Sequence, residues 1–197
     1  AQMEQGKMYA ILGPSGCGKT TLLSLLGGLD SPSSGQILYQ GEDIAKTGLA
    51  DHRRNHVAFI FQSYNLIDYL TPMENVALTS KLPPLPILEQ LGLTAEEAKR
   101  NVLKLSGGQQ QRVAIARALA SDAQVILADE PTGNLDEDTA AEITAILKDS
   151  AHKSGKCVVI VTHSNELAKE ADVVFRLRKG DLQISDTSEI EQERKKK

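Results

Sequence analysis

Short apolar runs alternate with longer stretches of helical periodicity along this chain. The apolar runs predict buried strands at 8–12, 124–128 and 157–162. The helical spacing of apolar residues predicts helices at 19–26, 107–121 and 138–150. Because strands and helices alternate, we expect a mostly parallel sheet flanked by helices, with ligands bound at the carboxyl ends of its strands. The predicted fold class is therefore α/β.

Two other regions depart from this alternation. Residues 36–39 and 57–62 predict strands joined by polar turns, which we interpret as a small antiparallel β layer. From 63 to 105 the apolar residues are spaced more widely, and prolines gather at positions 83, 84 and 86. The pattern there predicts short helices at 72–80, 87–91 and 94–103. We therefore expect one domain over 1–197 with an inserted helical subdomain at about 63–105.

Composition then excludes several classes of protein. Of the 197 residues, 41% are hydrophobic and 24% are charged, which excludes disordered and fibrous chains. The longest apolar runs fall far short of the roughly 20 residues that cross a bilayer, and residues 1–9 lack the pattern of a signal peptide. Cys17 and Cys157 stand in no metal-ligand pattern, which favours free thiols in the cytoplasm.

Charge narrows the choice of partner. The net charge of −4 argues against a nucleic-acid partner. One local exception is the basic run Arg194–Lys197. That run leaves two alternatives open, a solvated tail or a contact with anionic lipid.

Candidate chemistry begins directly after the first predicted strand. The loop between that strand and the next helix fits G-x-x-x-x-G-K-[ST]. Its residues are Gly13, Pro14, Ser15, Gly16, Cys17, Gly18, Lys19 and Thr20, with Thr21 beside them. Glycines let backbone N–H groups converge on phosphate oxygens, and the helix start adds partial positive charge. We expect Lys19 to bridge the β- and γ-phosphates of a nucleotide and the Thr20 hydroxyl to bind Mg²⁺.

An acidic pair follows the apolar strand that ends at 128. Asp129 and Glu130 emerge where the sheet is expected to bind its ligands. Asp129 is a candidate ligand of Mg²⁺, and Glu130 is a candidate general base for an attacking water. The alternative is a solvated acidic turn that leads into Pro131-Thr132-Gly133.

A third motif carries a resemblance to a known family. Residues Leu105 to Arg112 contain an LSGGQ string. With this string, the chain resembles the nucleotide-binding domain of ATP-binding cassette (ABC) proteins, which share a P-loop NTPase fold, over nearly its whole length. The family's other motifs follow in its order: Gln62 after the β layer, Asn134-Leu135-Asp136 after the acidic pair, and His163 after the strand 157–162.

The resemblance implies how these residues act. In the family, two domains pack head to tail on two molecules of Mg-ATP. Each signature segment closes on the γ-phosphate held by the second copy, which implies phosphate contacts for Ser106, Gly107, Gly108 and Gln109. Gln62 is implied to touch Mg²⁺ and water, and His163 to hold the γ-phosphate and the water beside Glu130. Asp136 is implied to reach across the dimer, and it is also a candidate cap for the helix that starts near 138.

The residues around three motifs narrow the resemblance to one branch. Phe61–Ile67, Leu70–Val76 and Ala128–Asp136 look most like the ATPases of bacterial macrolide exporters, lipoprotein-releasing complexes and antimicrobial-peptide exporters. That branch implies a separate integral membrane permease and a peripheral position on the cytoplasmic face of the membrane. The permease's cytoplasmic helix is expected to dock near 64–74. The apolar residues there form either its socket or ordinary subdomain core: Tyr64, Leu66, Ile67, Tyr69 and Leu70.

Three other functions stay open. An importer ATPase is not excluded by these motifs. A DNA-repair or ribosome-associated cassette protein usually carries tandem cassettes, coiled-coil insertions or zinc motifs, and this sequence has none. A regulatory subunit without turnover is disfavoured by Glu130 and His163. Domains of the family usually begin with two further strands and an aromatic residue that stacks on adenine. We expect these to be missing here and Tyr9 to lie in the core.

Overall fold

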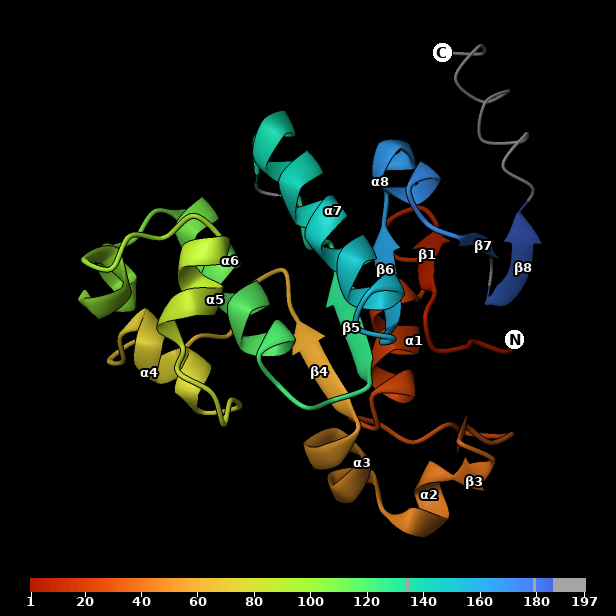
Figure 1. Ribbon diagram of the computed structural model, residues 1–197. Helices are drawn as coiled ribbons and strands as arrows, with labels where there is room; N and C mark the ends of the chain where they lie inside the picture. The colour runs from red at the N-terminus through yellow and green to blue at the C-terminus, as the bar shows by residue number, and fades with distance from the viewer. Residues whose placement is uncertain (134, 179, 186–197) are drawn as a thin grey trace.

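The central element of the computed structural model, which describes residues 1–133, 135–178 and 180–185, is a six-stranded sheet (Figure 1). Asn134 and the basic run Arg194–Lys197 lie outside the described residues, so the hypotheses about them are not addressed by the structure. The strand order is β4-β5-β6-β1-β7-β8. The strands span Val57–Ile60 (β4), Val125–Asp129 (β5), Cys157–Thr162 (β6), Met8–Leu12 (β1), Val173–Arg178 (β7) and Asp181–Ser185 (β8).

Pairing within this sheet confirms the predicted fold class. β4, β5, β6, β1 and β7 pair in parallel, and only β8 runs antiparallel to its neighbour β7. Every residue of β1 and of β6 is buried. Such fully apolar strands require cover on both faces of the sheet.

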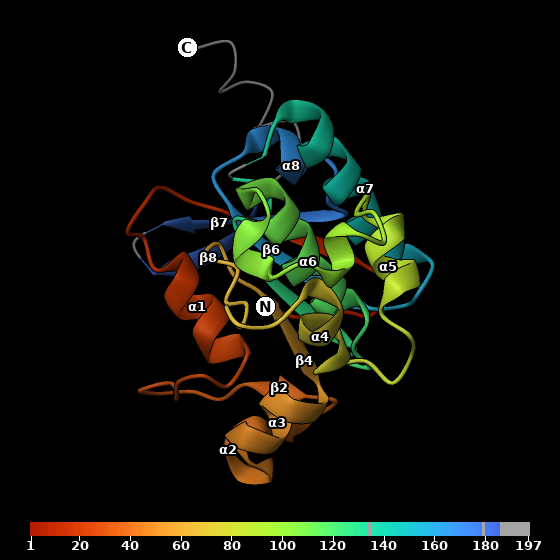
Figure 2. The same ribbon diagram turned by 90° about the vertical axis from the view of Figure 1, so that its left-hand side faces the viewer.

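Alternate side chains of β1 enter two separate cores. Met8 and Ala10 face a core that includes Ile143 and Leu147, whereas Tyr9 faces a core that includes Leu23. Four helices supply the cover: α1 (Lys19–Leu26), α6 (Gly107–Leu119), α7 (Glu137–His152) and α8 (Asn165–Lys169). Figure 2 shows α1 on one side of the sheet and α7 on the other. Loops at the carboxyl edge are thereby presented between two layers of helix.

The small β layer differs from its prediction. β2 (Leu38–Tyr39) and β3 (Glu42–Asp43) form a two-stranded antiparallel sheet, but 57–60 belongs to the central sheet as β4. Residues 44–55 are not polar turns, because they form α2 (Ile44–Thr47) and α3 (Leu49–Asn55). The side chain of Asp43 accepts a hydrogen bond from the Ala45 N–H and so caps α2.

The expected helical subdomain contains shorter pieces than predicted. Its elements are α4 (Pro72–Ala77), α5 (Leu85–Gln90), and the 3₁₀ turns η1 (Glu97–Lys99) and η2 (Val102–Lys104). The prediction of one helix over 94–103 is wrong, because Arg100 and Asn101 have extended backbone conformations that separate the two turns. α4 begins with a capping box between Thr71 and Glu74, which fixes its start. α4 packs against α6 beside β4 (Figure 1).

Within the described part of the chain, no helix combines the length and the apolar composition that crossing a bilayer requires.

Candidate functional site

The loop from Gly13 to Gly18 joins β1 to α1 at the carboxyl edge of the sheet. Gly16 and Gly18 have φ of 77° and 99°, left-handed conformations that favour glycine. A side chain at Gly13 would meet the Leu177 carbonyl oxygen at 2.8 Å, so the close approach of two backbones requires glycine there. Lys19 Nζ donates to the carbonyl oxygens of Gly13 and Pro14 at 2.7 and 3.0 Å, which holds the ammonium over the loop.

Thr20 and Asp129 meet at the mouth of this loop. The Thr20 hydroxyl donates to Asp129 Oδ2 at 3.0 Å, joining the first turn of α1 to the end of β5. Burial raises the pKa of the Asp129 carboxyl, and the charge of Glu130 raises it further, while the Thr20 hydrogen bond and Lys19 oppose the shift. The Thr20 hydroxyl and the Asp129 carboxylate match the oxygen ligands that Mg²⁺ prefers.

Glu130 is held by three residues at the end of β6. Its backbone N–H donates to the Val161 carbonyl oxygen at 3.0 Å. Its Oε2 accepts a hydrogen bond from the Thr162 hydroxyl at 2.9 Å, and its Oε1 lies 2.8 Å from His163 Nδ1. Its φ of 46° is left-handed, which turns the chain sharply after β5. The carboxylate is therefore fixed in orientation beside Asp129.

Thr162 is a site residue that sequence reasoning missed. It is fully buried, and its hydroxyl both donates to Glu130 and accepts the Ser164 N–H at 3.0 Å. The available signal was a hydroxyl residue at the end of an apolar strand, directly before His163. That position lies at the carboxyl edge of the strand next to β5.

The signature segment forms the N-terminus of α6. Ser106 and Gln109 make a capping box, in which Ser106 Oγ accepts the Gln109 N–H and Gln109 Oε1 accepts the Ser106 N–H. Gln109 Nε2 also donates to Glu97 at 2.7 Å, so the structure gives this side chain a capping role. Ser106 and Gly107 are exposed and Gly108 is half-buried, which leaves this helix start open to a ligand.

The remaining predicted residues lie around this edge. Gln62 is exposed and follows β4, two residues beyond its end. Asp136 is the N-cap of α7, and its Oδ1 accepts the Thr139 N–H at 2.9 Å, which confirms the capping hypothesis. Tyr9 is buried and stacks on Phe175, with ring centroids 6.1 Å apart, which confirms it as a core residue.

The chain segment after β4 is joined to α6 by hydrogen bonds. Tyr64 and Asn65 have left-handed φ angles, and their carbonyl oxygens both accept hydrogen bonds from the Arg117 guanidinium. Of the predicted socket residues, Tyr69 is 81% exposed, whereas Leu66 packs against the larger core. Tyr69 is therefore available to a partner, whereas Leu66 contributes to the core.

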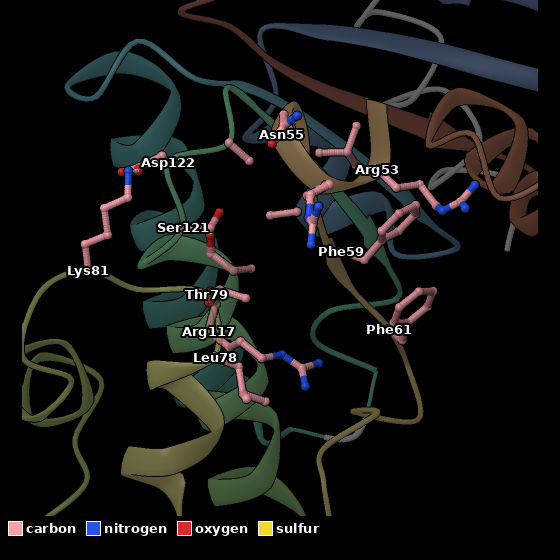
Figure 3. A pocket seen from close by; sticks show the side chains of 15 residues that line it. Arg53, Asn55, Phe59, Phe61, Leu78, Thr79, Lys81, Arg117, Ser121 and Asp122 are labelled. Carbon is pink, nitrogen blue, oxygen red and sulfur yellow. Dashed lines mark hydrogen bonds and ion pairs between the residues drawn. The ribbon is translucent and has the colours of Figure 1, made fainter. Parts of the chain in front are cut away.

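A pocket of about 550 Å³ lies beside this segment, between β4 with α3 and the helices α4 and α6. Figure 3 shows Arg53, Phe59 and Phe61 on one side of it and Leu78 and Arg117 on the other. The rings of Phe59 and Phe61 stack with centroids 5.0 Å apart. The pocket therefore combines an aromatic wall with basic side chains, and its lining does not include residues 64–74.

Comparison with known proteins gives matches along most of the chain. The family model "ABC transporter" matches residues 1–133. An uncharacterized ABC transporter ATP-binding protein of Bacillus subtilis, YclH, is 46% identical over 93% of this chain and 85% of its own length. The lipoprotein-releasing system ATP-binding protein LolD of Chromohalobacter salexigens is 42% identical over 90% of this chain and 80% of its own. The macrolide export ATP-binding/permease protein MacB 2 of Aeromonas hydrophila is 45% identical, but this chain spans 30% of its length.

Solved structures agree with these sequence matches. The dimeric structure of MJ0796, described as a bacterial ABC transporter cassette, has a TM-score of 0.87 and 36% identity, covering 95% of this chain and 88% of that one. A post-hydrolysis dimer of the same cassette, bound to ADP and phosphate, has a TM-score of 0.85 and 35% identity over the same shares of the two chains.

Proposed function

This chain belongs to the ABC transporter family as an ATP-binding, ATP-hydrolysing subunit, and we propose that it acts as a head-to-tail homodimer that drives an export-type membrane permease. The observation that carries the proposal is the convergence of Lys19, Asp129, Glu130 and His163 at one edge of the sheet, with the open signature helix start in the same chain.

Each residue of the convergent set has a distinct proposed role in hydrolysis. The loop N–H groups and Lys19 bind the β- and γ-phosphates, and a phosphate oxygen replaces the two carbonyls that Lys19 contacts here. Glu130 accepts a proton from the attacking water, since Thr162 and His163 fix its carboxylate. His163 is 72% exposed, so its ring is free to contact the γ-phosphate.

Mg²⁺ is a further component of the proposal. The fit rests on the 3.0 Å contact between Thr20 Oγ1 and Asp129 Oδ2 and on the raised pKa of Asp129, whose charge a cation would stabilise. Thr20 would bind the ion directly and Asp129 directly or through water, with Gln62 reaching it from the end of β4. When bound, the ion offsets phosphate charge.

Dimerisation is supported by the signature segment itself. The exposed N-terminus of α6 is a second anion-binding site on the chain, in addition to the loop at Gly13–Gly18. In the proposed dimer, the nucleotide bound to the second copy occupies this site and contacts Ser106 and Gly108. The relatedness to the dimeric cassette MJ0796 supports the same arrangement.

We extend the permease contact expected near 64–74 to the pocket shown in Figure 3. Its lining carries Arg53, Arg54, Arg117 and Lys81, while its acid Asp122 is paired with Lys81 at 2.8 Å. The excess positive charge beside stacked aromatic rings fits an amphipathic helix with acidic residues. A contact of this kind places the chain peripherally on the cytoplasmic face of the membrane.

Export is favoured over import by the relatives. The names of two matched proteins specify macrolide export and lipoprotein release. An importer ATPase is the second candidate, and the direction of transport by the reconstituted complex with its permease separates the two.

The experiment that tests the motor compares wild type with Glu130→Gln. Light scattering with and without Mg-ATP measures mass, and phosphate release measures turnover. We expect the variant to lose turnover by a factor of about 10² to 10⁴, as removal of a general base does, and to shift from monomer to dimer with ATP. If neither protein binds ATP or dimerises, the proposal is wrong.

A charge reversal tests the permease contact. Arg54 lies in the pocket lining on the exposed face of α3, and the test variant is Arg54→Glu. The matched control is Lys153→Glu, at an exposed lysine directly after α7. With the permease that copurifies from detergent-solubilised membranes, we expect the first variant to lose stimulated ATPase activity and to keep basal activity. Equal stimulation of both variants would exclude this docking surface.

A further inference from the structure

Gln111 is a buried polar residue on the helix that the signature segment begins. It lies in the second turn of α6 and is 3% exposed. Its Nε2 donates to the Pro131 carbonyl oxygen at 2.9 Å, while its Oε1 has no hydrogen-bond partner among the residues that the structure describes. Burying an unpartnered amide oxygen costs free energy. An apolar side chain of similar size would suit the core better, so packing alone does not explain this glutamine.

Pro131 gives the contact its significance, because it directly follows Glu130. The Glu130 carboxylate is held from β6 by Thr162 and His163, whereas the backbone after it is held from α6 by Gln111. The position of a general base relative to its water controls the rate, and a displacement of about 1 Å lowers it strongly. Gln111 is thus placed to affect catalysis through Glu130.

α6 also carries the segment assigned to the second nucleotide. Its first residues, Gly107 and Gly108, follow the Ser106 cap, four and three residues before Gln111. Arg112, next to Gln111, donates to Thr139 on α7 at 3.2 Å, so α6 is joined to both ends of the turn after Glu130. Because a helix moves as a rigid element, a displacement of its first residues also displaces the residues one turn later.

We propose that Gln111 is a positioning residue that couples the two nucleotide sites of the dimer. ATP held by the partner engages the signature segment of one protomer, and Gln111 then sets the position of Glu130 in that same protomer. The coupling arises because contact of ATP with Gly107 and Gly108 shifts the start of α6, and the hydrogen bond from Gln111 carries that shift to Pro131. This inference rests on the proposed head-to-tail dimer.

The test uses two copies of the full chain joined by a flexible linker. In the first form both copies are intact. In the second form one of the two copies carries Lys19→Ala, which prevents phosphate binding in the loop of that copy. The intact copy then hydrolyses ATP while its own signature segment faces no nucleotide. We expect its turnover per site to be at least fivefold below that of the doubly intact form. Gln111→Met is then placed in both forms, in the copy that keeps Lys19 in the second form. We expect the turnover per site of that copy to be equal in the two forms, and its KM for ATP to lie within twofold of wild type.

Controls separate coupling from general damage. Ser150→Ala removes another buried side-chain hydrogen bond, to the Ile146 carbonyl oxygen on α7, and should keep the wild-type ratio. Thermal unfolding checks that Gln111→Met is folded, and Gln111→Glu, which places a carboxylate against the Pro131 carbonyl, is the second variant. The ratio compared is the turnover per site in the doubly intact form divided by that in the form with Lys19→Ala. A wild-type ratio of one, or a folded Gln111 variant that keeps the wild-type ratio, overturns the coupling alone. Failure of Glu130→Gln to dimerise with Mg-ATP overturns the dimer as well.

Discussion

Glu130 Oε1 and His163 Nδ1 lie 2.8 Å apart, yet the glutamate side chain is 12% exposed and the histidine side chain 72% exposed. The pair therefore joins a sheltered carboxylate to a ring that faces solvent. Because the Glu130 carboxylate accepts, Nδ1 carries the hydrogen, and Nε2 is the ring atom left for a phosphate or water. Loss of the exposed His163 ring should therefore affect turnover more than stability.

His163→Ala removes an exposed ring, so the free energy of unfolding should change by no more than about 0.5 kcal/mol. Turnover should fall by a factor of about 10² or more, since both the γ-phosphate contact and the orientation of Glu130 are lost. Phosphate release at saturating ATP and urea unfolding measure the two effects. A variant that keeps more than half of wild-type turnover would contradict the assigned role.

Thr162→Val keeps the shape of a fully buried side chain and removes its hydroxyl. Glu130 loses one hydrogen bond and the Ser164 N–H loses its acceptor, so stability should fall by about 1–2 kcal/mol. Turnover should fall roughly tenfold with little change in KM, because Glu130 loses orientation and not charge. Thr144→Val, another buried threonine whose hydroxyl bonds within α7, is the control that should keep turnover.

Acidification should destabilise the protein through His52. This buried ring donates from Nε2 to the Leu26 carbonyl oxygen, and its Nδ1 lies 3.2 Å from His56 Nδ1. Burial lowers the pKa of His52; the nearby His56 lowers it further, while the Leu26 hydrogen bond and Asp51 oppose the shift. The unfolded state therefore binds the proton first, so this stability is present above about pH 6.5 and is lost as the pH falls below that value.

Urea unfolding between pH 8 and pH 5 measures this effect, whose limiting slope for one proton is about 1.4 kcal/mol per pH unit. His52→Gln removes the titrating group and should flatten the slope. His152→Gln, at an exposed histidine that contacts Asp172, is the comparison. Equal slopes in wild type and His52→Gln would rule out His52 as the acid-sensitive group.

The two cysteines should react with alkylating reagents at very different rates. Burial raises the pKa of the Cys157 thiol to about 11, whereas Cys17 is partly exposed in the loop before α1. Since the thiolate is the reactive form, iodoacetamide at pH 8 should modify one thiol per native chain and two in urea. Mg-ATP should protect Cys17. Mass spectrometry identifies the modified residue, and rapid labelling of Cys157 in the native protein would contradict the burial.

Sequence patterns predicted the elements that carry their own local signals. The bounds of β1, α1 and β6 coincide with prediction, because each is a continuous apolar or helical run that ends at glycine or polar residues. The meeting of Asp129 with Thr20 was also predictable, since the carboxyl ends of all parallel strands lie at one edge of a sheet.

Features that depend on distant partners were not predictable in this way. The apolar run 57–60 pairs with β5, and nothing local distinguishes that partner from β2. The contact between Gln111 and Pro131 joins residues far apart in the sequence, and it became visible only when α6 was packed on the turn after β5. The helix α8 is too short for a periodic signal.

The left-handed backbone of Glu130 places a conformational penalty at the residue that is the proposed proton acceptor. A non-glycine residue with φ of 46° carries a conformational penalty of about 1 kcal/mol or more, which glycine avoids. Glu130→Gly would remove this penalty, but it would also leave the buried Thr162 hydroxyl without its acceptor and the chain without its proposed proton acceptor.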